Sequence, residues 1–352
     1  MQATIEQLQD TIARAAEART PLQIHGTGSK HFYGNPARGE RLDVSGYSGI
    51  IDYDPRELVI SVRAGTTLRA VEATMAAEGQ MLACEPPCFG GTGTIGGCVA
   101  AGLSGPRRAY AGAVRDLLLG ARIVNGKGED LSFGGRVIKN VAGYDVTRLM
   151  AGAMGTLGVL LEVSFKALPL PAAQQTLRFE MDETQAIETM NRWAGQPLPL
   201  SATCYHAGIL TVRLSGAQAA VRAAQAKLGG EQVAQAEDFW LALRDQSAPF
   251  FADAHTLWRV SLPSTTMPLN TGLPQLIEWG GGLRWLAGVT DAAQLRQQTA
   301  RLGGHAILFR SADKSAGAFH PLPPGLAKIH RGLKHAFDPH GILNPGRLYD
   351  DL

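Results

Sequence analysis

The stretch CFGGTGTIGGCVAAG, from Cys88 to Gly102, carries six glycines in fifteen residues and decides how the fold is interpreted. Within it, Gly91-Thr-Gly93-Thr-Ile-Gly96 has the G-x-G-x-x-G spacing of a dinucleotide-binding Rossmann loop. Such a loop must follow a buried strand and open a helix. The preceding residues read CEPPCFG, and prolines do not occur in central strands. Further glycines and a proline follow within ten residues, so the pattern predicts a fold other than Rossmann.

A phosphate cradle requires less than a Rossmann fold, because it needs only consecutive backbone N–H groups that face one point. Glycine makes this possible because it adopts positive φ readily and leaves space for phosphate oxygens. The chain has a second candidate loop, IHGTGSK, from Ile24 to Lys30, directly after a short apolar run. No G-x-x-x-x-G-K-[ST] motif occurs anywhere. We therefore expect two loops, near residues 27 and 96, to converge on one diphosphate.

The overall composition indicates a globular protein of about two domains, with 352 residues, 45% hydrophobic and 18% charged. A net charge of +2 offers no basic stripe for nucleic acid. The first nineteen residues mix acids and bases and place apolar residues at helical spacing, which predicts an amphipathic helix and not a signal peptide. The longest uncharged run, 193–212, contains two prolines and makes a poor membrane span. We expect a cytoplasmic protein without a direct membrane span.

The four cysteines, Cys84, Cys88, Cys98 and Cys204, form no C-x-x-C pair. A zinc or iron–sulfur site would need closer spacing and more ligands. We expect reduced and mostly buried thiols, and any iron–sulfur chemistry must come from another chain.

Residues 1–170 are expected to form the first domain, which is rich in glycine and short β-like runs. Helical spacing and a threonine cap predict a helix over 66–79, and GARIVNGKGEDLSFGG predicts a hairpin with an Asn-Gly turn. A proline-containing linker at 166–175 leads into residues 171–318, where β-α-β-β-α units predict an antiparallel α+β cap domain with its helices on one face. This pattern includes a short helix near 269–276. Residues 319–352 form a helix and a tail.

Three blocks together resemble the FAD-binding domain of the vanillyl-alcohol-oxidase, or PCMH, type. They are IHGTGSK, the block TGTIGGCVAAGLSGPRRAYAGAVRDLLLGARIVNGKGE, and the block VIKNVAGYDVTRLMAGAMGTLGVLLEVSFKALP. The ending FDPHGILNPGR is similar to that of flavin-dependent glycolate and D-lactate dehydrogenases, and the short chain looks most like the FAD-binding subunits of glycolate oxidases. The resemblance implies a two-subdomain FAD-binding domain of α+β class.

The resemblance also implies which residues surround the FAD. These are the first loop His25, Gly26, Thr27, Gly28 and Ser29, the second loop Thr94, Ile95, Gly96 and Gly97, the flanking residues Gly102, Arg107, Arg108, Tyr110 and Gly112, and Gly155, Thr156, Gly158 and Val163. Independently of the family, Lys30, Arg107 and Arg108 carry positive charge that can offset a diphosphate. Each arginine is equally well explained as an ordinary surface residue.

Two departures from the family pattern bear on function. Many relatives carry a flavin-bonding histidine in an R-x-G-G-H loop, which HGTGS does not match, so noncovalent FAD is favoured, and we expect His25 to be a wall or structural residue. Hydroxy-acid dehydrogenases of the family carry G-H-x-G-D-x-N-x-H, whose histidines help to hold a metal. The nearest stretch here, Gly304 to Arg310, lacks the Asp, the Asn and the second His. No metal site is expected.

The resemblance therefore implies an accessory or electron-relaying FAD subunit of a glycolate-oxidising complex. Its partners would be a catalytic flavoprotein subunit and an iron–sulfur subunit, and any membrane association would come through them. A purely structural flavin-fold subunit and a self-sufficient FAD dehydrogenase of a small hydroxy acid or alcohol remain alternatives. No catalytic residue is assigned, and the candidates are Lys139, Asn140, Tyr144, Arg310, His320 and Asn344. For Lys139, Asn140 and Tyr144 we favour packing of a loop under the flavin, for Asn344 a return of the tail to the first domain, and Arg310 can equally be a solvated strand end.

Overall fold

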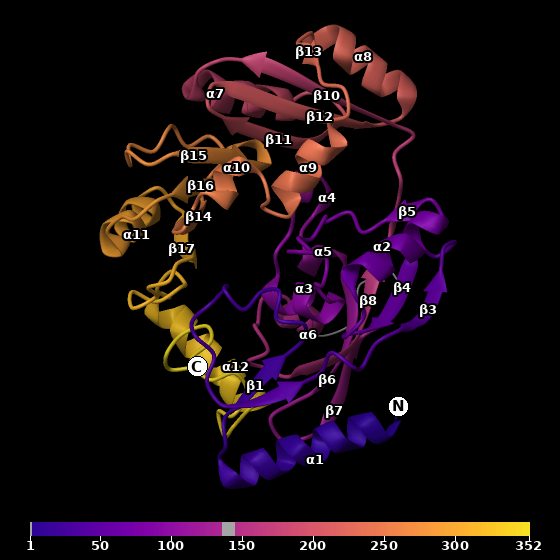
Figure 1. The fold of residues 1–352 in the computed structure, drawn as a ribbon, viewed down its shortest axis with the longest axis vertical. Helices are drawn as coiled ribbons and strands as arrows, with labels where there is room; N and C mark the ends of the chain where they lie inside the picture. Colours follow the sequence, from indigo (N-terminus) through magenta and orange to yellow (C-terminus); the bar gives the residue numbers. More distant parts are fainter. Residues whose placement is uncertain (1, 136–144) are drawn as a thin grey trace.

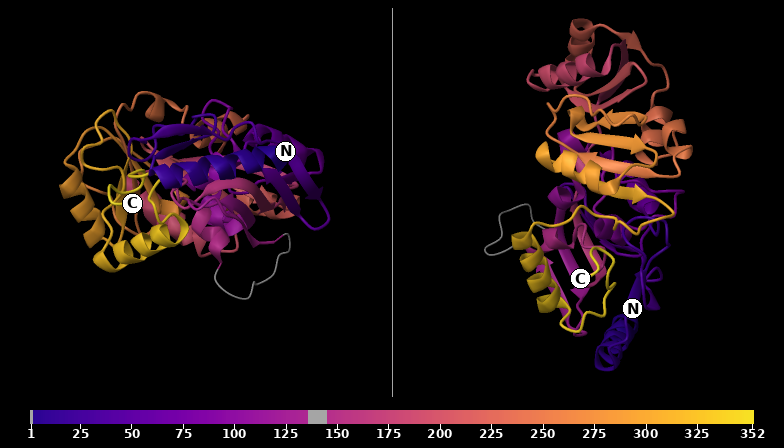
Figure 2. Two further views of the ribbon diagram at one scale, coloured as in Figure 1. Left: turned by 90° about the horizontal axis from the view of Figure 1, so that it is seen from below. Right: turned by 90° about the vertical axis from the view of Figure 1, so that its left-hand side faces the viewer.

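The computed structural model describes residues 2–135 and 145–352. Figure 1 shows two bodies stacked along the long axis, with the elements up to β9 in the lower body and β10 to β17 in the upper body. The C-terminal helix α12 (Pro324–Phe337) returns to the lower body, and Figure 2 shows it beside the strands there. The division at residues 170 and 318 stays a prediction, to which this arrangement conforms.

The lower body contains two small sheets and one larger one. Within the described residues, β3-β4-β8-β6-β7 form a five-stranded antiparallel sheet, β1 pairs with β2 in parallel, and β5 pairs with β9. The elements are α1 (Gln2–Ala18), β1 (Leu22–His25), β2 (Glu40–Asp43), β3 (Ile50–Asp54), β4 (Val59–Arg63), α2 (Leu68–Ala77), β5 (Gln80–Met81), α3 (Ile95–Ala101), α4 (Arg108–Ala111), α5 (Val114–Leu117), β6 (Leu118–Val124), β7 (Asp130–Gly134), α6 (Val146–Met150), β8 (Val159–Lys166) and β9 (Leu168–Pro169).

Local sequence signals explain several of these elements. Helix α1 buries Ile5, Leu8 and Ile12, as the helical spacing predicts. Helix α2 begins after Thr67, whose hydroxyl accepts a hydrogen bond from the N–H of Ala70 at 3.2 Å. Strands β6 and β7 form the predicted hairpin around residues 125–129. These three predictions are confirmed.

The glycine-rich stretch does not lie in a Rossmann unit. No described residue between 82 and 94 belongs to a strand, and the helix that follows, α3, has seven residues. It ends at Gly102, which adopts the left-handed conformation with φ of 63°. The sheet that α3 packs on is antiparallel. The rejection of the Rossmann interpretation is confirmed.

The upper body is an antiparallel sheet in the order β13-β10-β12-β11-β15-β16-β14-β17, eight strands in the described chain. This confirms the predicted antiparallel α+β architecture. Its elements are β10 (Ala173–Glu180), α7 (Glu183–Ala194), β11 (Leu200–His206), β12 (Ile209–Gly216), α8 (Gln218–Leu228), β13 (Glu231–Gln232), α9 (Glu237–Arg244), α10 (Pro249–Ala252), β14 (Leu257–Ser261), β15 (Gln275–Glu278), the 3-10 turn η1 (Trp279–Gly281), β16 (Leu283–Ala287), α11 (Ala292–Arg301) and β17 (His305–Arg310).

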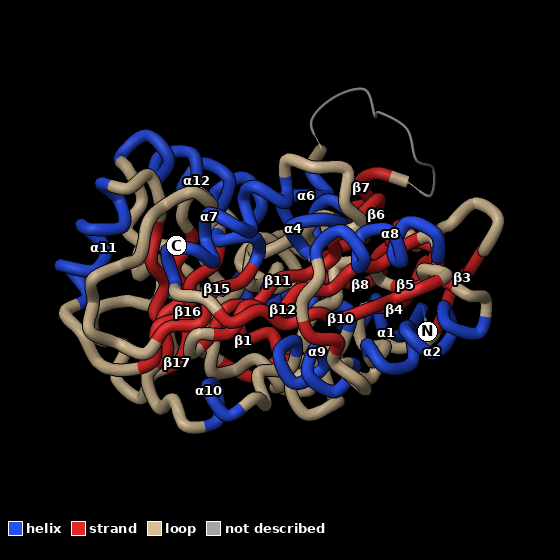
Figure 3. The backbone as a smooth tube through the Cα atoms, turned by 90° about the horizontal axis from the view of Figure 1, so that it is seen from above, coloured by secondary structure: helices blue, strands red, loops and turns tan. Residues whose placement is uncertain are grey.

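Two details of the cap prediction are wrong. The expected helix near 269–276 does not form, since Gly272 adopts positive φ and Pro274 lacks an N–H, and β15 begins at Gln275. Helices also cover both faces of the sheet. Helices α7, α8 and α11 pack on one face, and Figure 3 shows α9 and α10 on the other side of the strands. Trp240 of α9 and Phe251 of α10 pack there in a cluster that includes Leu103 of the lower body.

Candidate functional site

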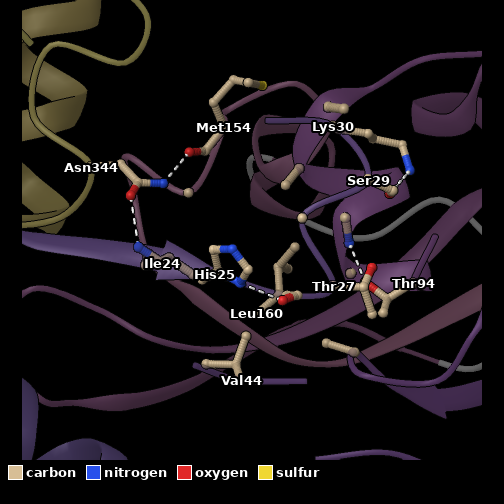
Figure 4. A pocket seen from close by; sticks show the side chains of 18 of the residues that line it. Ile24, His25, Thr27, Ser29, Lys30, Val44, Thr94, Met154, Leu160 and Asn344 are labelled. Atoms are coloured by element: carbon tan, nitrogen blue, oxygen red, sulfur yellow. Dashed lines mark hydrogen bonds between the residues drawn. The ribbon is translucent and has the colours of Figure 1, made fainter. Parts of the chain in front are cut away.

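The two predicted loops line one pocket of the lower body (Figure 4). Its volume is about 130 Å³, and residues 24–31 face residues 94–101 across it. A third wall comes from residues 154–160, and the tail closes the pocket with Asn344 and Arg347. Ten of the predicted site residues line it, namely His25, Gly26, Thr27, Gly28, Ser29, Thr94, Gly96, Gly97, Gly155 and Gly158.

The first loop presents a row of free backbone donors. Within the described chain, the N–H groups of residues 26–30 have no hydrogen-bond partner. Gly28 has φ of +80°, and a Cβ there would lie 3.1 Å from the ring of His31. Only glycine adopts this positive φ and leaves the space beside His31 open without strain. Successive unpaired N–H groups in such a bend form a concave site for anions.

Two cations beside this loop lack an acidic partner. Lys30 and Arg347 form no salt bridge with any described residue. Lys30 Nζ lies 3.4 Å from Ser29 Oγ, and burial lowers its pKa below the ordinary value. Arg347 donates to the carbonyls of Lys30, His31 and Asn35, and burial lowers its pKa to about 10. Uncompensated buried cations are unfavourable without an anion nearby, so the pocket is suited to a dianionic diphosphate.

The second loop has fewer free backbone donors than the first, and its contact with a diphosphate stays a prediction. Three of its four N–H groups are already used, because Ile95 donates to Thr66 O, Gly96 to Ala64 O and Gly97 to Thr94 Oγ1, at 2.8 to 3.1 Å. A Cβ on Gly96 would lie 2.7 Å from the Cβ of Ala64. Gly96 therefore allows α3 to pack closely on the end of β4 and places Thr94 and Gly97 in the pocket wall. It does not supply a free donor.

The tail fastens the first and third walls to each other. Asn344 accepts a hydrogen bond from Ile24 N at 2.8 Å and donates to Met154 O at 2.6 Å. Gly155 has φ of +74°, and a Cβ there would lie 2.7 Å from Asn344 Nδ2. The NPGR ending was expected to return the tail to this body, but Asn344 and Arg347 were not among the predicted FAD-binding residues. The NPGR motif after a helix signals a turn, but it does not reveal which loops of the chain the tail reaches.

The other eight predicted residues do not line the pocket, and their contact with FAD stays a prediction. Arg107 bonds Glu85 at 3.1 Å, and Arg108 packs on the ring of Trp279. The remaining six have structural roles beneath or beside the walls. Ile95 and Val163 are buried in the core, and Gly102 and Gly112 end helices α3 and α4. Tyr110 is half-buried against the cap, and the hydroxyl of Thr156 donates to Ala153 O.

The catalytic candidates have structural partners where they are described. Arg310 donates to Phe251 O at 2.9 Å, and His320 Nδ1 accepts from Ala306 N at 3.2 Å. Lys139, Asn140 and Tyr144 lie outside the described residues. His25 lines the pocket, with its Nδ1 next to Gly26 O and its ring 4.4 Å from that of His31.

Metal ligands and reactive thiols do not gather in the part of the chain that the structure describes. Residues 2–135 and 145–352 contain no group of three or more His, Cys, Asp or Glu side chains placed to hold a metal ion. As predicted, the four cysteines are buried and free of disulfides, and burial raises their pKa values. Across the same residues, every helix is too short or too polar to cross a bilayer.

Comparisons with known proteins identify the family of the chain. A sequence family described as an FAD binding domain matches residues 2–134. The chain is 48% identical over 351 residues to the glycolate oxidase subunit GlcE of Escherichia coli, covering 100% of this chain and 98% of that protein. It is 32% identical over 168 residues to the glycolate oxidase subunit GlcD of Bacillus subtilis, covering 46% of this chain and 35% of that protein.

A solved structure of p-cresol methylhydroxylase with substrate bound shares the fold. The TM-score is 0.74 at 17% identity, covering 99% of this chain and 87% of that one. The cofactor of this fold is FAD, which suits the free donors and unpaired cations of the pocket. The chain belongs to the family of FAD-dependent oxidoreductases that comprises the GlcE subunits of glycolate oxidase.

Proposed function

We propose that this chain is the FAD-binding subunit of a complex that oxidises glycolate to glyoxylate, and that it depends on partner chains for substrate oxidation. The partners are a catalytic flavoprotein subunit and an iron–sulfur subunit. The likeness to GlcE over the whole chain supports the assignment to a complex. The separate partial likeness to GlcD supports a partner that is itself a flavoprotein.

The chain's own residues bind and orient the cofactor in this proposal. The N–H groups of residues 26–30 donate to the diphosphate, and Lys30 and Arg347 balance its charge. Asn344 keeps the first and third walls at a fixed separation through its bonds to Ile24 and Met154. When bound, FAD supplies the group that accepts two electrons from an alcohol and releases them to an acceptor. We expect noncovalent binding, because HGTGS does not match the flavin-bonding R-x-G-G-H loop.

The observation that carries the accessory role is the packing of β17. The closest match to the metal-binding motif of hydroxy-acid dehydrogenases begins at Gly304-His305, and the residues after it are Ala306, Ile307, Leu308 and Phe309. All four are buried in apolar clusters. Phe309 packs edge-on to Trp285 with ring centroids 4.9 Å apart. The position of the motif's aspartate is thus taken by Leu308, a core side chain, that of its asparagine by Arg310 and that of its second histidine by Ala312, none of which is a metal ligand.

The test is anaerobic addition of glycolate to the purified flavin-loaded chain, with and without its partner chains. The expected result is no bleaching of the visible flavin absorbance by glycolate alone, and bleaching at a kinetically competent rate when the partners are present. Bleaching by glycolate alone would show a self-sufficient dehydrogenase. A flavin that is never bleached within the active complex would show a scaffold role. Acid precipitation that leaves flavin on the protein would refute noncovalent binding.

A further inference from the structure

The cap carries a large groove that is separate from the FAD pocket. Its volume is about 840 Å³, and it lies between helices α9 and α10 over strands β10, β12, β11 and β15. Every residue that lines it falls within residues 178–276 of the cap, so the described part of the lower body contributes no wall. The groove therefore shares no residue with the pocket formed by residues 24–31 and 94–101.

The floor and the sides of this groove are largely apolar. In the sheet register His206 lies between Ile209 and Leu276, so the three side chains share one face of the sheet. Two half-buried rings flank them, Phe239 of α9 and Phe250 of α10. The ring of Phe250 stands edge-on to that of His206, with centroids 5.1 Å apart. The groove thus offers an aromatic-sided apolar surface that remains partly open to solvent.

Helix α9 has apolar side chains on more than one face. Trp240 is buried in the cap core, whereas Phe239 and Ala242 are half-buried and line the groove. Leu241, on a further face, is 41% exposed. A helix that is apolar on all sides is normally enclosed by other elements. The groove side of α9 is therefore suited to a further packing partner.

The segment that forms this side of the groove is acidic, although the whole chain has a net charge of +2. Residues 231–253 contain five acidic residues and a single basic one. Arg244 and Asp245 bond each other at 3.1 Å, and Arg244 also bonds Glu72 of the lower body. The other four acids form no salt bridge with any described residue, and they are Glu231, Glu237, Asp238 and Asp253.

Four unpaired carboxylates surround the groove. Glu180 and Glu231 line it directly, and both are exposed. Asp238 and Asp253 lie three or four residues from groove-lining positions of α9 and α10, and therefore on the same helix faces. Arg178 also lines the groove without a salt bridge, so one guanidinium stands against four carboxylates. An apolar surface with a charged rim is typical of a protein-binding site, and the sign of this rim favours a basic partner.

We propose that this groove is the docking site of a basic amphipathic helix from a partner chain. The apolar side chains of that helix fill the floor between Phe239 and Phe250, and its lysine or arginine side chains face the rim carboxylates. A groove of this volume takes several side chains. The site uses no residue of the FAD pocket and does not depend on the proposed function.

The experiment is a fluorescence anisotropy titration of a labelled synthetic peptide with the FAD-loaded full chain. The peptide has about 18 residues, enough to form a helix, with leucine at helical spacing on one face and lysine elsewhere. The expected result is saturable binding that weakens as salt is added. A peptide with the same leucines and glutamate in place of lysine should bind at least about tenfold more weakly. The positive net charge of the chain disfavours binding of the lysine peptide elsewhere on its surface.

Variants of the groove decide where the peptide binds. Ala242→Lys places bulk and a positive charge in the groove and should weaken binding about tenfold or more. Glu180→Gln combined with Glu231→Gln changes only exposed rim charges and should weaken it about twofold to tenfold. The matched controls, Ala219→Lys on α8 and Glu188→Gln on α7, are exposed and should bind as wild type. Flavin absorbance and thermal unfolding show that each protein is folded, and the double glutamine variant decides if Ala242→Lys does not fold.

Equal binding of the lysine and glutamate peptides would overturn the inference, as would wild-type affinity in a folded Ala242→Lys protein. A second copy of the chain is the competing occupant, because α12 carries exposed Leu326 and Ile329 beside the basic Lys328. Sedimentation velocity of the FAD-loaded chain separates the two, and the expected species is a monomer. A wild-type dimer that Ala242→Lys dissociates would assign the groove to self-association and refute docking of a different chain.

Discussion

Gly96 and Ala64 lie so close together that a Cβ on Gly96 would be 2.7 Å from the Cβ of Ala64 and 2.8 Å from its carbonyl oxygen. Gly96 also donates its N–H to that carbonyl at 2.8 Å. This contact joins the first turn of α3 to the end of β4 and places Thr94 and Gly97 in the wall of the pocket that we propose for FAD.

Gly96→Val should therefore abolish FAD retention. The added side chain cannot fit against Ala64 and must push α3 away from β4, which destroys the pocket wall. The ratio of flavin to protein absorbance after gel filtration measures the loss, and proteolytic resistance of residues 175–310 shows that the cap remains folded. Gly46→Val is the matched control, because Gly46 is exposed and an added Cβ there meets nothing within 4 Å. Normal flavin content in the Gly96→Val protein would refute this role of Gly96.

The convergence of the loops near residues 27 and 96 was predictable, because glycine spacing and family blocks are local features of the sequence. Which backbone N–H groups of each loop are free to bind a ligand was not predictable. Gly96 reads as a phosphate-binding glycine, yet its N–H is used by Ala64, a partner 32 residues away that no local pattern reveals. Arg347 was missed as a pocket cation for the same reason, since the tail reaches Lys30 and His31 only in the folded chain. The predicted helix near 269–276 failed because Gly272 adopts positive φ and Pro274 lacks an N–H, so the apolar residues there pack into the cap core from a loop.

Lys30→Gln should weaken FAD binding about tenfold to a hundredfold. Lys30 is a half-buried ammonium that forms no salt bridge with a described residue and lies beside the free N–H groups of its own loop, so its charge is available to the diphosphate. A hydrogen bond to a charged group contributes about 1.5–3 kcal/mol. Fluorescence titration of the apoprotein with FAD measures the dissociation constant, and Lys328→Gln, on exposed helix surface, should leave it unchanged. Equal affinity of the Lys30→Gln and wild-type proteins would remove Lys30 from the site.

Glu85→Gln should destabilise the protein by about 3–5 kcal/mol, the usual effect of removing one partner of a buried ion pair. Glu85 receives Arg107 of the lower body and Arg213 of the cap, and the Arg213 side chain is only 4% exposed. The substitution leaves two buried guanidinium groups with a neutral acceptor. Chemical denaturation followed by circular dichroism measures the change, with Glu57→Gln on the surface as the control. A loss below about 1 kcal/mol, the size typical of an exposed pair, would contradict this role of Glu85.

Glu278→Gln should remove a pH dependence of stability. Glu278 is 4% exposed, and burial raises its pKa from 4.5 to about 7, so the folded protein binds a proton between these values that the unfolded chain has released. Stability from this group is thus fully present below pH 4.5 and is lost as the pH rises through 7, by about 3 kcal/mol. The amide that replaces the carboxyl does not titrate, and its oxygen can still accept the hydrogen bond from Trp285.

The difference between the unfolding free energies at pH 5 and pH 8 should therefore be smaller in the Glu278→Gln protein than in wild type. The control Glu188→Gln, at an exposed position, should keep the wild-type difference. An unchanged pH dependence in the Glu278→Gln protein would show that the carboxyl stays ionised in the folded chain.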